Sequence, residues 1–545
     1  MDTGLDSAFD LLKGVLKPPV SLPTRLQRLL PTSGTLHGLH APARRLHPGL
    51  LSLLGGLRGL AQVIFINNPL SGLVLLLAFL AQSPWTALLA LLGISAAHAT
   101  ARQLDLQPGL RREGIYGFNG ALVGCAVAAI AHLEHPLAVV AWGGLVLLGG
   151  ALSTLVLEGL RRSLHPALGL PPLTLPFCLI SWILLAVGSF GPGSALALAE
   201  PVAPPVLDGA WQALAQGLPR SLGQVFLCSK LGSGLLVLLS VALASPLAAG
   251  LALLGALVGM GTGLLLGAPI EAIAQGLWGY NGVLVAIALG GIFYAPSLGS
   301  LAVALGGAAL ATLLQSAWSV SALQGWPSFT LAFVLATWVV QLVVRRALPA
   351  LIPVSLHAIV TPEEHRQRFV LARTLLSDFR RNLHLAHHGQ RRALLAGRVP
   401  ALTRQRISVL FDRLDRDGDG AISTAELLKG LQLNPRSASD TGVLACQLTE
   451  VLTAMDLDGN GRVDAEEFAE LMLRLQRLQL GEERLLTYLL PVDGNGNDRL
   501  DPIELRRLFT SVGVRPLLAE EEDALFARSP QGLTWRQFVD RLLLT

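Results

Sequence analysis

The sequence predicts an all-α protein in which a polytopic membrane domain precedes a soluble α-helical domain. The first observation is the distribution of charge: residues 51–344 carry only 15 charged residues, whereas residues 345–545 carry 54. About a quarter of the residues in an ordinary globular domain are charged, so the first segment suits lipid and the second suits water. The other two observations are an internal repeat within the apolar segment and a set of acidic loops after it.

Composition divides the chain into five regions. Residues 1–50 carry basic residues among Pro and Gly and lack the apolar core of a secretory signal, so we expect a cytosolic arm. We expect membrane repeats over 51–200 and 201–346, a basic helical linker over 347–404 and a soluble domain over 405–545. The four cysteines lie far apart and predict buried thiols, and the net charge of +4 predicts no nucleic-acid partner.

The apolar segment contains runs of uneven length between Leu57 and Val344. Some runs can form the roughly 20 residues of helix that cross a bilayer, and shorter ones predict tilted or half-spanning helices. Arg58 and Glu158 fall near segment edges, which leaves Lys230 and Glu271 as candidates for a deeper position. Because coupling to protons or cations usually requires ionisable residues inside spans, the neutral polar residues favour a small uncharged solute.

The internal repeat relates the two halves of the apolar segment by a shift of 162 residues. GIYGFNG (114–120) falls on GLWGYNG (276–282), and Gln62 falls on Gln224. A later pair, LTLPF (173–177) and FTLAF (329–333), repeats at a shift of 156. Duplicated membrane halves commonly enclose a transport site at their interface, where broken helices present backbone polar groups to the solute.

The apolar segment resembles the urea transporter family over roughly residues 50–345, in the motifs QVIFINNPLSG, SPW, YGFN, WGYN and TLPF. This resemblance implies two inverted halves, each of five membrane helices and one tilted half-helix. It further implies a homotrimer in membrane lipid, with a urea pore inside each subunit.

The same resemblance implies that each half lines the pore with a Gln, a slot of aromatic and aliphatic side chains, and a central Thr. The first half supplies Gln62, Phe65, Phe118, Leu122 and Thr174. The second half supplies Gln224, Leu227, Tyr280, Leu284 and Thr330. A Thr or Gln in a membrane helix more often joins helices than binds a solute. Because the whole set is duplicated in the two halves, we interpret these residues as pore residues.

The linker predicts an amphipathic helix, because apolar residues recur at helical spacing among many Arg residues. The apolar positions are Phe369, Leu375, Leu376, Phe379 and Leu383. Two interpretations remain open: a linker helix beside anionic lipid, or a target helix for the domain that follows.

Two loops in the last region match the EF-hand pattern. Their ligand positions are Asp415, Asp417, Asp419, Ala421, Ser423 and Glu426 in the first loop, and Asp456, Asp458, Asn460, Arg462, Asp464 and Glu467 in the second. Ca²⁺ takes about six to eight oxygens, supplied here by side chains and, at Ala421 and Arg462, by a backbone carbonyl. Gly at position 6 permits the turn. The spacing predicts calcium binding by both loops.

A third loop departs from the pattern. Its ligand positions are Asp493, Asn495, Asn497, Arg499, Asp501 and Glu504. Asp498 occupies the position of the turn Gly, and the loop has three carboxylates where each of the others has four. We therefore expect weaker binding. A fourth remnant, LTWRQF (533–538), lacks acidic ligands and is expected to pair with the third loop.

Together these features predict a channel-type facilitator of urea in the cytoplasmic membrane, with a C-terminal EF-hand domain that binds calcium and regulates flux or buffers the ion. An even number of spans and the basic flanking segments predict that both termini and the EF-hand domain are cytoplasmic. No P-loop, catalytic triad or zinc pattern is found, so we expect no enzyme. Two alternatives stay open: a calcium-sensing membrane protein without flux, and a channel for another small neutral solute such as ammonia or a short amide.

Overall fold

The fold is mostly helical, which confirms the predicted class. The computed structural model describes residues 33–36, 48–189, 196–199, 209–321, 325–348, 351, 360–387, 401–423, 426, 456–457, 460–474, 497, 499–527, 529–535, 537–538 and 542. The chain forms two compact units, one spanning Thr24–Arg366 and the other including Gln367–Thr545. The basic linker expected over 347–404 is thus divided between the two units.

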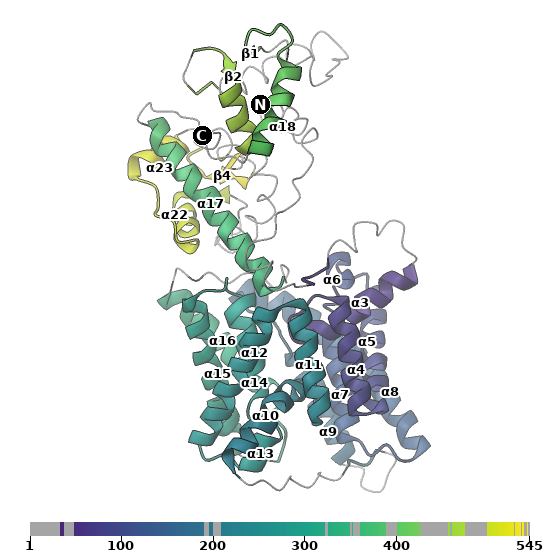
Figure 1. The fold of residues 1–545 in the computed structure, drawn as a ribbon. Coiled ribbons are helices and arrows are strands. Elements are labelled where there is room, and N and C mark those ends of the chain that lie inside the picture. Colours follow the sequence, from purple (N-terminus) through teal and green to yellow (C-terminus); the bar gives the residue numbers. More distant parts are fainter. Residues whose placement is uncertain are drawn as a thin grey trace. The chain divides into compact units, whose positions relative to one another are not determined.

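The first unit contains two successive sets of helices, both visible in Figure 1. The first set is α3 (Pro48–Gln62), α4 (Pro69–Gln82), α5 (Pro84–Gln103), α6 (Pro108–Arg112), α7 (Phe118–Ile130), α8 (Pro136–Leu168) and α9 (Leu175–Ser189). The second set is α10 (Ala210–Gln224), α11 (Leu231–Ala244), α12 (Pro246–Leu265), α13 (Ile270–Ala274), α14 (Tyr280–Ile287), the π-helical turn η2 (Ala288–Ile292), α15 (Leu298–Ser319) and α16 (Leu331–Ala347). Helices α4 and α11 have 14 residues each, and α5 and α12 have 20 each, so the order of elements follows the sequence repeat.

Four helices of the described residues are long and apolar enough to cross a membrane. They are α5, residues Pro136–Leu164 of α8, α12 and α15. Shorter apolar helices accompany them at α4, α7, α9, α11 and the continuous segment Tyr280–Ile292. This mixture of lengths matches the uneven apolar runs of the sequence.

Glycines set the closest approach between helices at equivalent places in the two halves. A side chain at Gly93 would collide with the backbone of Gly120, and one at Gly255 would collide with the backbone of Gly282. The first pair joins α5 to α7, and the second pair joins α12 to α14. Small residues let membrane helices pack backbone against backbone, so these positions fix the helices that carry the candidate pore residues.

Arg58, which was expected near the edge of a segment, is fully buried. Its guanidinium donates to the carbonyl oxygen of Thr35 at 3.0 Å and to the backbone and side-chain oxygens of Asn67 at 2.8 Å each. A buried cation needs such acceptors, so Arg58 fixes the segment 33–36 and the turn before α4 against α3. The two residues expected to lie deeper, Lys230 and Glu271, are both exposed.

The second unit contains the EF-hand elements. They are most of α17 (Pro362–His387), α18 (Ala401–Leu414), β1 (Ala421–Ile422), β2 (Val463–Asp464), β3 (Arg499–Leu500), α22 (Pro502–Ser511), α23 (Ala519–Phe526) and β4 (Leu533–Thr534). The strands form two antiparallel pairs, β1 with β2 and β3 with β4. The second pair joins Leu500 to Leu533, which confirms that the fourth remnant pairs with the third loop.

The apolar face of α17 is covered within the second unit. Leu376 and Phe379 are buried, and the Phe379 ring centroid lies 6.5 Å from that of Phe509 and 5.8 Å from that of Phe538. His384 Nδ1 lies 2.8 Å from a carboxylate oxygen of Glu521. These contacts favour the target-helix interpretation of the linker over the lipid-surface one, because the EF-hand domain already covers the face that lipid would contact.

Candidate functional site

The two central threonines meet where the two halves of the membrane unit contact each other. Thr174 directly precedes α9, Thr330 directly precedes α16, and their Oγ1 atoms are 2.6 Å apart. Both residues are only 3% exposed. The Sγ atom of Cys178 lies 3.4 Å from the hydroxyl of Thr330. Two residues 156 positions apart in the chain therefore share one buried hydrogen bond at the predicted centre of the pore.

Strained backbone surrounds these threonines at four non-glycine residues. Leu173 and Phe329, immediately before the threonines, have φ angles of 53° and 45°. Phe65 and Leu227, which are related by the sequence repeat, have φ angles of 59° and 56°. The left-handed region costs an L-residue roughly 1–2 kcal/mol, and residues held there cluster at functional sites. Leu36 and Asp105 also have positive φ, so four of the six such non-glycine residues in the described part of the chain carry or adjoin candidate pore residues.

The paired glutamines end equivalent helices, α3 and α10. Gln62 Nε2 donates to the carbonyl oxygen of Glu113 at 3.1 Å, and Gln224 Nε2 donates to that of Gln275 at 3.0 Å. Gln62 is 4% exposed, and its buried Oε1 atom has no hydrogen-bond partner among the described residues. Such an acceptor costs about 1–3 kcal/mol when it stays unpaired. This oxygen can accept an N–H or O–H from a solute.

Aromatic rings from each half contact the other half. The Phe65 ring lies edge-on to Phe293 at 6.1 Å and to Phe333 at 6.0 Å between centroids, and Phe177 lies 5.2 Å from Phe329. Sequence reasoning selected Phe65 but not these partner rings. Phe177 and Phe333 are equivalent residues of the LTLPF and FTLAF motifs, so the repeat marked both positions. It could not show which rings meet, because the contacts join positions that the repeat does not relate.

The other slot residues lie in the same hydrophobic core. Leu122 and Leu284 are fully buried on α7 and α14, and Phe118 and Leu227 are partly buried. The hydroxyl of Tyr280 donates to the carbonyl oxygen of Phe329 at 2.5 Å, directly before Thr330. Tyr280 therefore holds a backbone group in place. Its repeat partner, Phe118, has no hydroxyl and cannot make this bond.

Asn119 and Asn281 act as positioning residues. Asn119 Oδ1 accepts the backbone N–H of Phe177 at 3.2 Å, and Asn281 Oδ1 accepts that of Phe333 at 3.2 Å. The first turn of a helix leaves N–H groups without partners, so these bonds fix the starts of α9 and α16. They thereby support the threonines at those helix starts.

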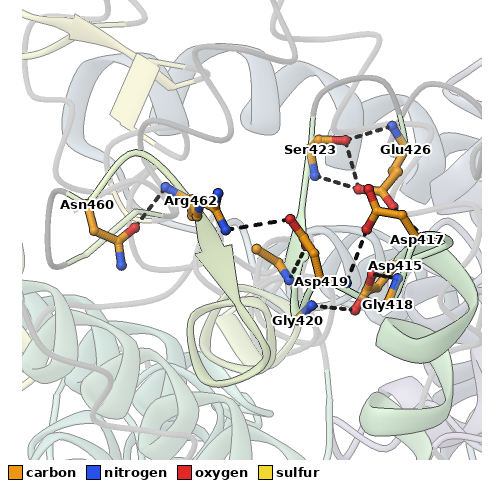
Figure 2. Close-up of polar contacts among 10 residues, drawn as sticks. Asp415, Asp417, Gly418, Asp419, Gly420, Ser423, Glu426, Asn460 and Arg462 are labelled. Atoms are coloured by element: carbon orange, nitrogen blue, oxygen red, sulfur yellow. Dashed lines mark hydrogen bonds and ion pairs between the residues drawn. The ribbon is translucent and has the colours of Figure 1, made fainter.

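The first EF-hand loop brings its acidic side chains together, as Figure 2 shows. Ligand oxygens of Asp415, Asp417 and Asp419 all lie within 4.8 Å of one another. The Asp415 carboxylate accepts the backbone N–H groups of Gly418 at 2.8 Å and Gly420 at 3.0 Å. Gly420 has a φ of 82°, which explains why the turn position requires Gly. The cluster is an all-oxygen donor set that fits a hard cation such as Ca²⁺.

The position-12 glutamate reaches both ends of the same loop. Glu426 accepts the N–H and hydroxyl of Ser423 at 3.0 and 2.7 Å, and the N–H of Arg416 at 2.7 Å. The hydrogen bonds from Ser423, more than any other contact, lower the pKa of the Glu426 carboxyl to about 2. The carboxylate is therefore charged at neutral pH, the state in which it can ligate a metal.

The second loop repeats this arrangement. Glu467 accepts the N–H of Leu457 at 2.7 Å and that of Asp464 at 3.1 Å, and Asp456 accepts that of Gly461 at 2.7 Å. Asp458, Asp493 and Asn495 lie outside the described residues.

The backbone N–H at position 7 donates to the side chain at position 5 in all three loops. The donor and acceptor pairs are Ala421 to Asp419 at 2.9 Å, Arg462 to Asn460 at 2.8 Å and Arg499 to Asn497 at 2.8 Å. The Arg462 guanidinium also lies 3.5 Å from Asp419, which joins the first two loops.

The third loop uses its last ligands as a helix cap. Asp501 accepts the N–H of Glu504 at 2.8 Å, and Glu504 accepts that of Asp501 at 3.2 Å. This reciprocal capping box starts α22. The same reciprocal bonds join positions 9 and 12 in the first two loops, between Ser423 and Glu426 and between Asp464 and Glu467, so the three loops share this cap.

Comparison with known proteins agrees with this division of the chain. Residues 54–345 match the family model "Urea transporter", and residues 404–473 match the model "EF-hand domain pair". The chain is similar to Urea transporter 1 of Ovis aries, with 33% identity over 318 residues that cover 57% of this chain and 81% of the relative. Urea transporter 1 of Capra hircus gives the same values, and that of Rattus norvegicus is 32% identical over 252 residues, covering 44% of this chain and 63% of the relative. The chain belongs to the urea transporter family and carries an EF-hand pair after its membrane unit.

Proposed function

We propose that the membrane unit is a channel through which urea diffuses across the cytoplasmic membrane. The observation that carries this proposal is the buried Thr174–Thr330 contact at the interface of the halves, together with the buried Oε1 atom of Gln62. Urea is flat and has N–H donors on its edge and one carbonyl acceptor. Hydroxyl and amide oxygens accept its donors, and the rings at Phe65 and Phe118 contact its faces.

Diffusion through such a site needs no energy source. Each hydrogen bond that urea loses to water is exchanged for a similar one, so the net gain per bond is about 1 kcal/mol and release stays fast. The slot residues are neutral, in keeping with an uncharged solute. The protein then acts as a transporter that changes no covalent bond.

The EF-hand domain binds Ca²⁺ in this proposal, with its first two loops as the strong sites. The first loop would hold the ion through carboxylates at positions 1, 3, 5 and 12 and the carbonyl of Ala421. The second loop would use carboxylates at positions 1, 3, 9 and 12, the amide oxygen of Asn460 at position 5 and the carbonyl of Arg462. Calcium acts on the channel through α17, because the helix that enters the EF-hand domain is the one that leaves the membrane unit.

We further propose a homotrimer of inverted repeats with both termini in the cytoplasm. The hydrogen bond of 3.1 Å between the Thr35 N–H and Glu364 Oε1 supports one part of this proposal, that the two segments flanking the membrane helices lie on the same side. It joins the segment before the first membrane helix to the segment after the last one. Two such segments can touch only when they emerge on the same face of the membrane unit.

Stopped-flow light scattering on proteoliposomes, with and without calcium, tests the proposal. Urea flux above that of empty vesicles supports a urea channel. Calcium binding without any flux supports the rival of a calcium-sensing membrane protein. Faster permeation by ammonia or a short amide than by urea supports a channel for another neutral solute.

A further inference from the structure

The first turn of α17 is anchored in the membrane unit by buried polar contacts. The Glu363 carboxylate accepts the hydroxyl of Ser245 at 2.5 Å and the backbone N–H of Leu247 at 2.8 Å. His365 Nδ1 lies 2.9 Å from the carbonyl oxygen of Gly291. Glu363 is 7% exposed and His365 is 1% exposed. A turn at the surface of a linker would instead leave these polar groups in water.

The repeat provides an internal reference, because among the described residues no carboxylate contacts the start of α5 in the first half. There Ser83 alone accepts the N–H groups of Trp85 and Thr86. Ser245, its counterpart in the second half, accepts the N–H of Ala248 and donates to Glu363. Glu363 thus completes the N-terminal cap of α12 from outside the repeat.

A second difference between the halves lies where His365 binds. Gly290 and Gly291 stand in the π-helical turn η2, whereas the corresponding residues of α7 are Ala128 and Ala129 in a regular helix. A Cβ atom at Gly291 would lie 2.6 Å from Cγ of Pro362. Gly at this position is therefore needed to admit the turn of α17. Single π-helical turns inside helices occur frequently at functional sites.

The π-helical turn leads directly to a ring that contacts the candidate pore. Phe293 follows η2, is 2% exposed, and packs edge-on against Phe65 with 6.1 Å between ring centroids. Phe65 is a slot residue held at a φ of 59°. A continuous path of contacts therefore runs from His365 through Gly291 and Phe293 to Phe65.

We propose that the turn Pro362–His365 positions the slot, with His365 as the positioning residue. By holding the carbonyl of Gly291, His365 fixes η2 and the Phe293 ring, and so sets the space that Phe65 leaves for the solute. This inference rests on the proposed urea channel and names a determinant of its selectivity. It also identifies the point at which movement of α17 reaches the pore.

The test compares His365→Ala, His365→Asn and Arg366→Ala in the full chain, reconstituted in proteoliposomes. The readouts are urea flux, the ratio of methylurea to urea permeability, and hydrogen exchange of the 288–293 amides. His365→Ala should raise the ratio by a factor on the order of five, the factor equivalent to one lost hydrogen bond, and speed exchange in η2. His365→Asn should restore both values, because its amide can donate from the position of Nδ1. Arg366 is exposed on the adjacent position and should behave as wild type.

The outcomes separate this inference from the function it rests on. An unchanged permeability ratio and unchanged exchange in His365→Ala would overturn the positioning role while leaving the channel intact. Gly291→Ala gives a second route, since its added methyl group displaces Pro362, and it should raise the ratio as His365→Ala does. If wild-type vesicles carry no urea flux but His365→Ala still speeds exchange at 288–293, the channel proposal fails and the anchoring of η2 stands.

Discussion

The hydrogen bond between Thr174 and Thr330 gives the sharpest test of the pore. Changing one Thr to Val keeps the side-chain shape but removes a hydroxyl, and the other hydroxyl loses its partner at 2.6 Å. A lost hydrogen bond costs about 1 kcal/mol, and a buried group left unpaired costs about 1–3 kcal/mol. Each single variant should therefore lose stability and slow urea flux about fivefold or more.

The double variant distinguishes a threonine pair that binds urea from a pair that only joins helices. With both hydroxyls replaced by methyl groups, neither threonine position keeps an unpaired hydroxyl, and only the weakly polar Sγ of Cys178 loses a contact. Stability should therefore recover relative to the sum of the single variants. Flux should not recover, because urea has lost both acceptors. If the pair only joins helices, flux should return together with stability.

Stopped-flow urea efflux per reconstituted protein, together with thermal unfolding in detergent, measures the two effects. Thr337→Val is a matched control on α16, because Thr337 is fully buried and its hydroxyl has no hydrogen-bond partner among the described residues. It should leave flux unchanged. Wild-type flux in the double variant would refute the assignment of Thr174 and Thr330 to the solute path.

Four further predictions follow from the same contacts. Glu426→Gln combined with Glu467→Gln should remove most calcium binding in titration calorimetry of the full chain, and Glu504→Gln should remove little; equal losses would contradict the ranking of the loops. Gln62→Leu should slow urea flux several-fold, since it removes an acceptor worth about 1 kcal/mol; unchanged flux would exclude Gln62 from the path. Arg58→Met should lower the unfolding temperature, because its buried carbonyl partners lose their donor at about 1–3 kcal/mol each; an unchanged melting curve would show that they find other donors. Cysteines placed in the N-terminal arm and in the EF-hand domain should react with impermeant reagents from the same side of the membrane, and labelling from opposite sides would refute the topology.

The sequence by itself determined the features that depend on local spacing. The low proportion of charged residues distinguishes the membrane unit from the EF-hand unit, because the solvent around each residue, lipid or water, restricts its type. The EF-hand loops were predicted residue by residue, since their ligands lie within 12 positions and Gly420 and Gly461 permit the turn. The repeat predicted the equivalence of the two halves, and the helix order of the second half follows that of the first.

Only the tertiary structure decided which distant groups meet. The Thr174–Thr330 hydrogen bond joins two different repeats, and alignment of the repeats assigns these residues equivalent positions without placing them in contact. The tertiary structure also decided the burial of Arg58, because its acceptors at Thr35 and Asn67 come from loops whose fold the sequence pattern does not reveal.

The contact between His365 and Gly291 is likewise decided by the tertiary structure. A helix pattern shows which residues share a face, but not which surface that face will contact. The contact needs a glycine that replaces the repeat's alanine within a π-helical turn, and the carboxylate that caps α12 comes from Glu363, far from that turn in the chain. A buried polar group needs a hydrogen-bond partner, and the fold decides which groups come close enough to serve as one.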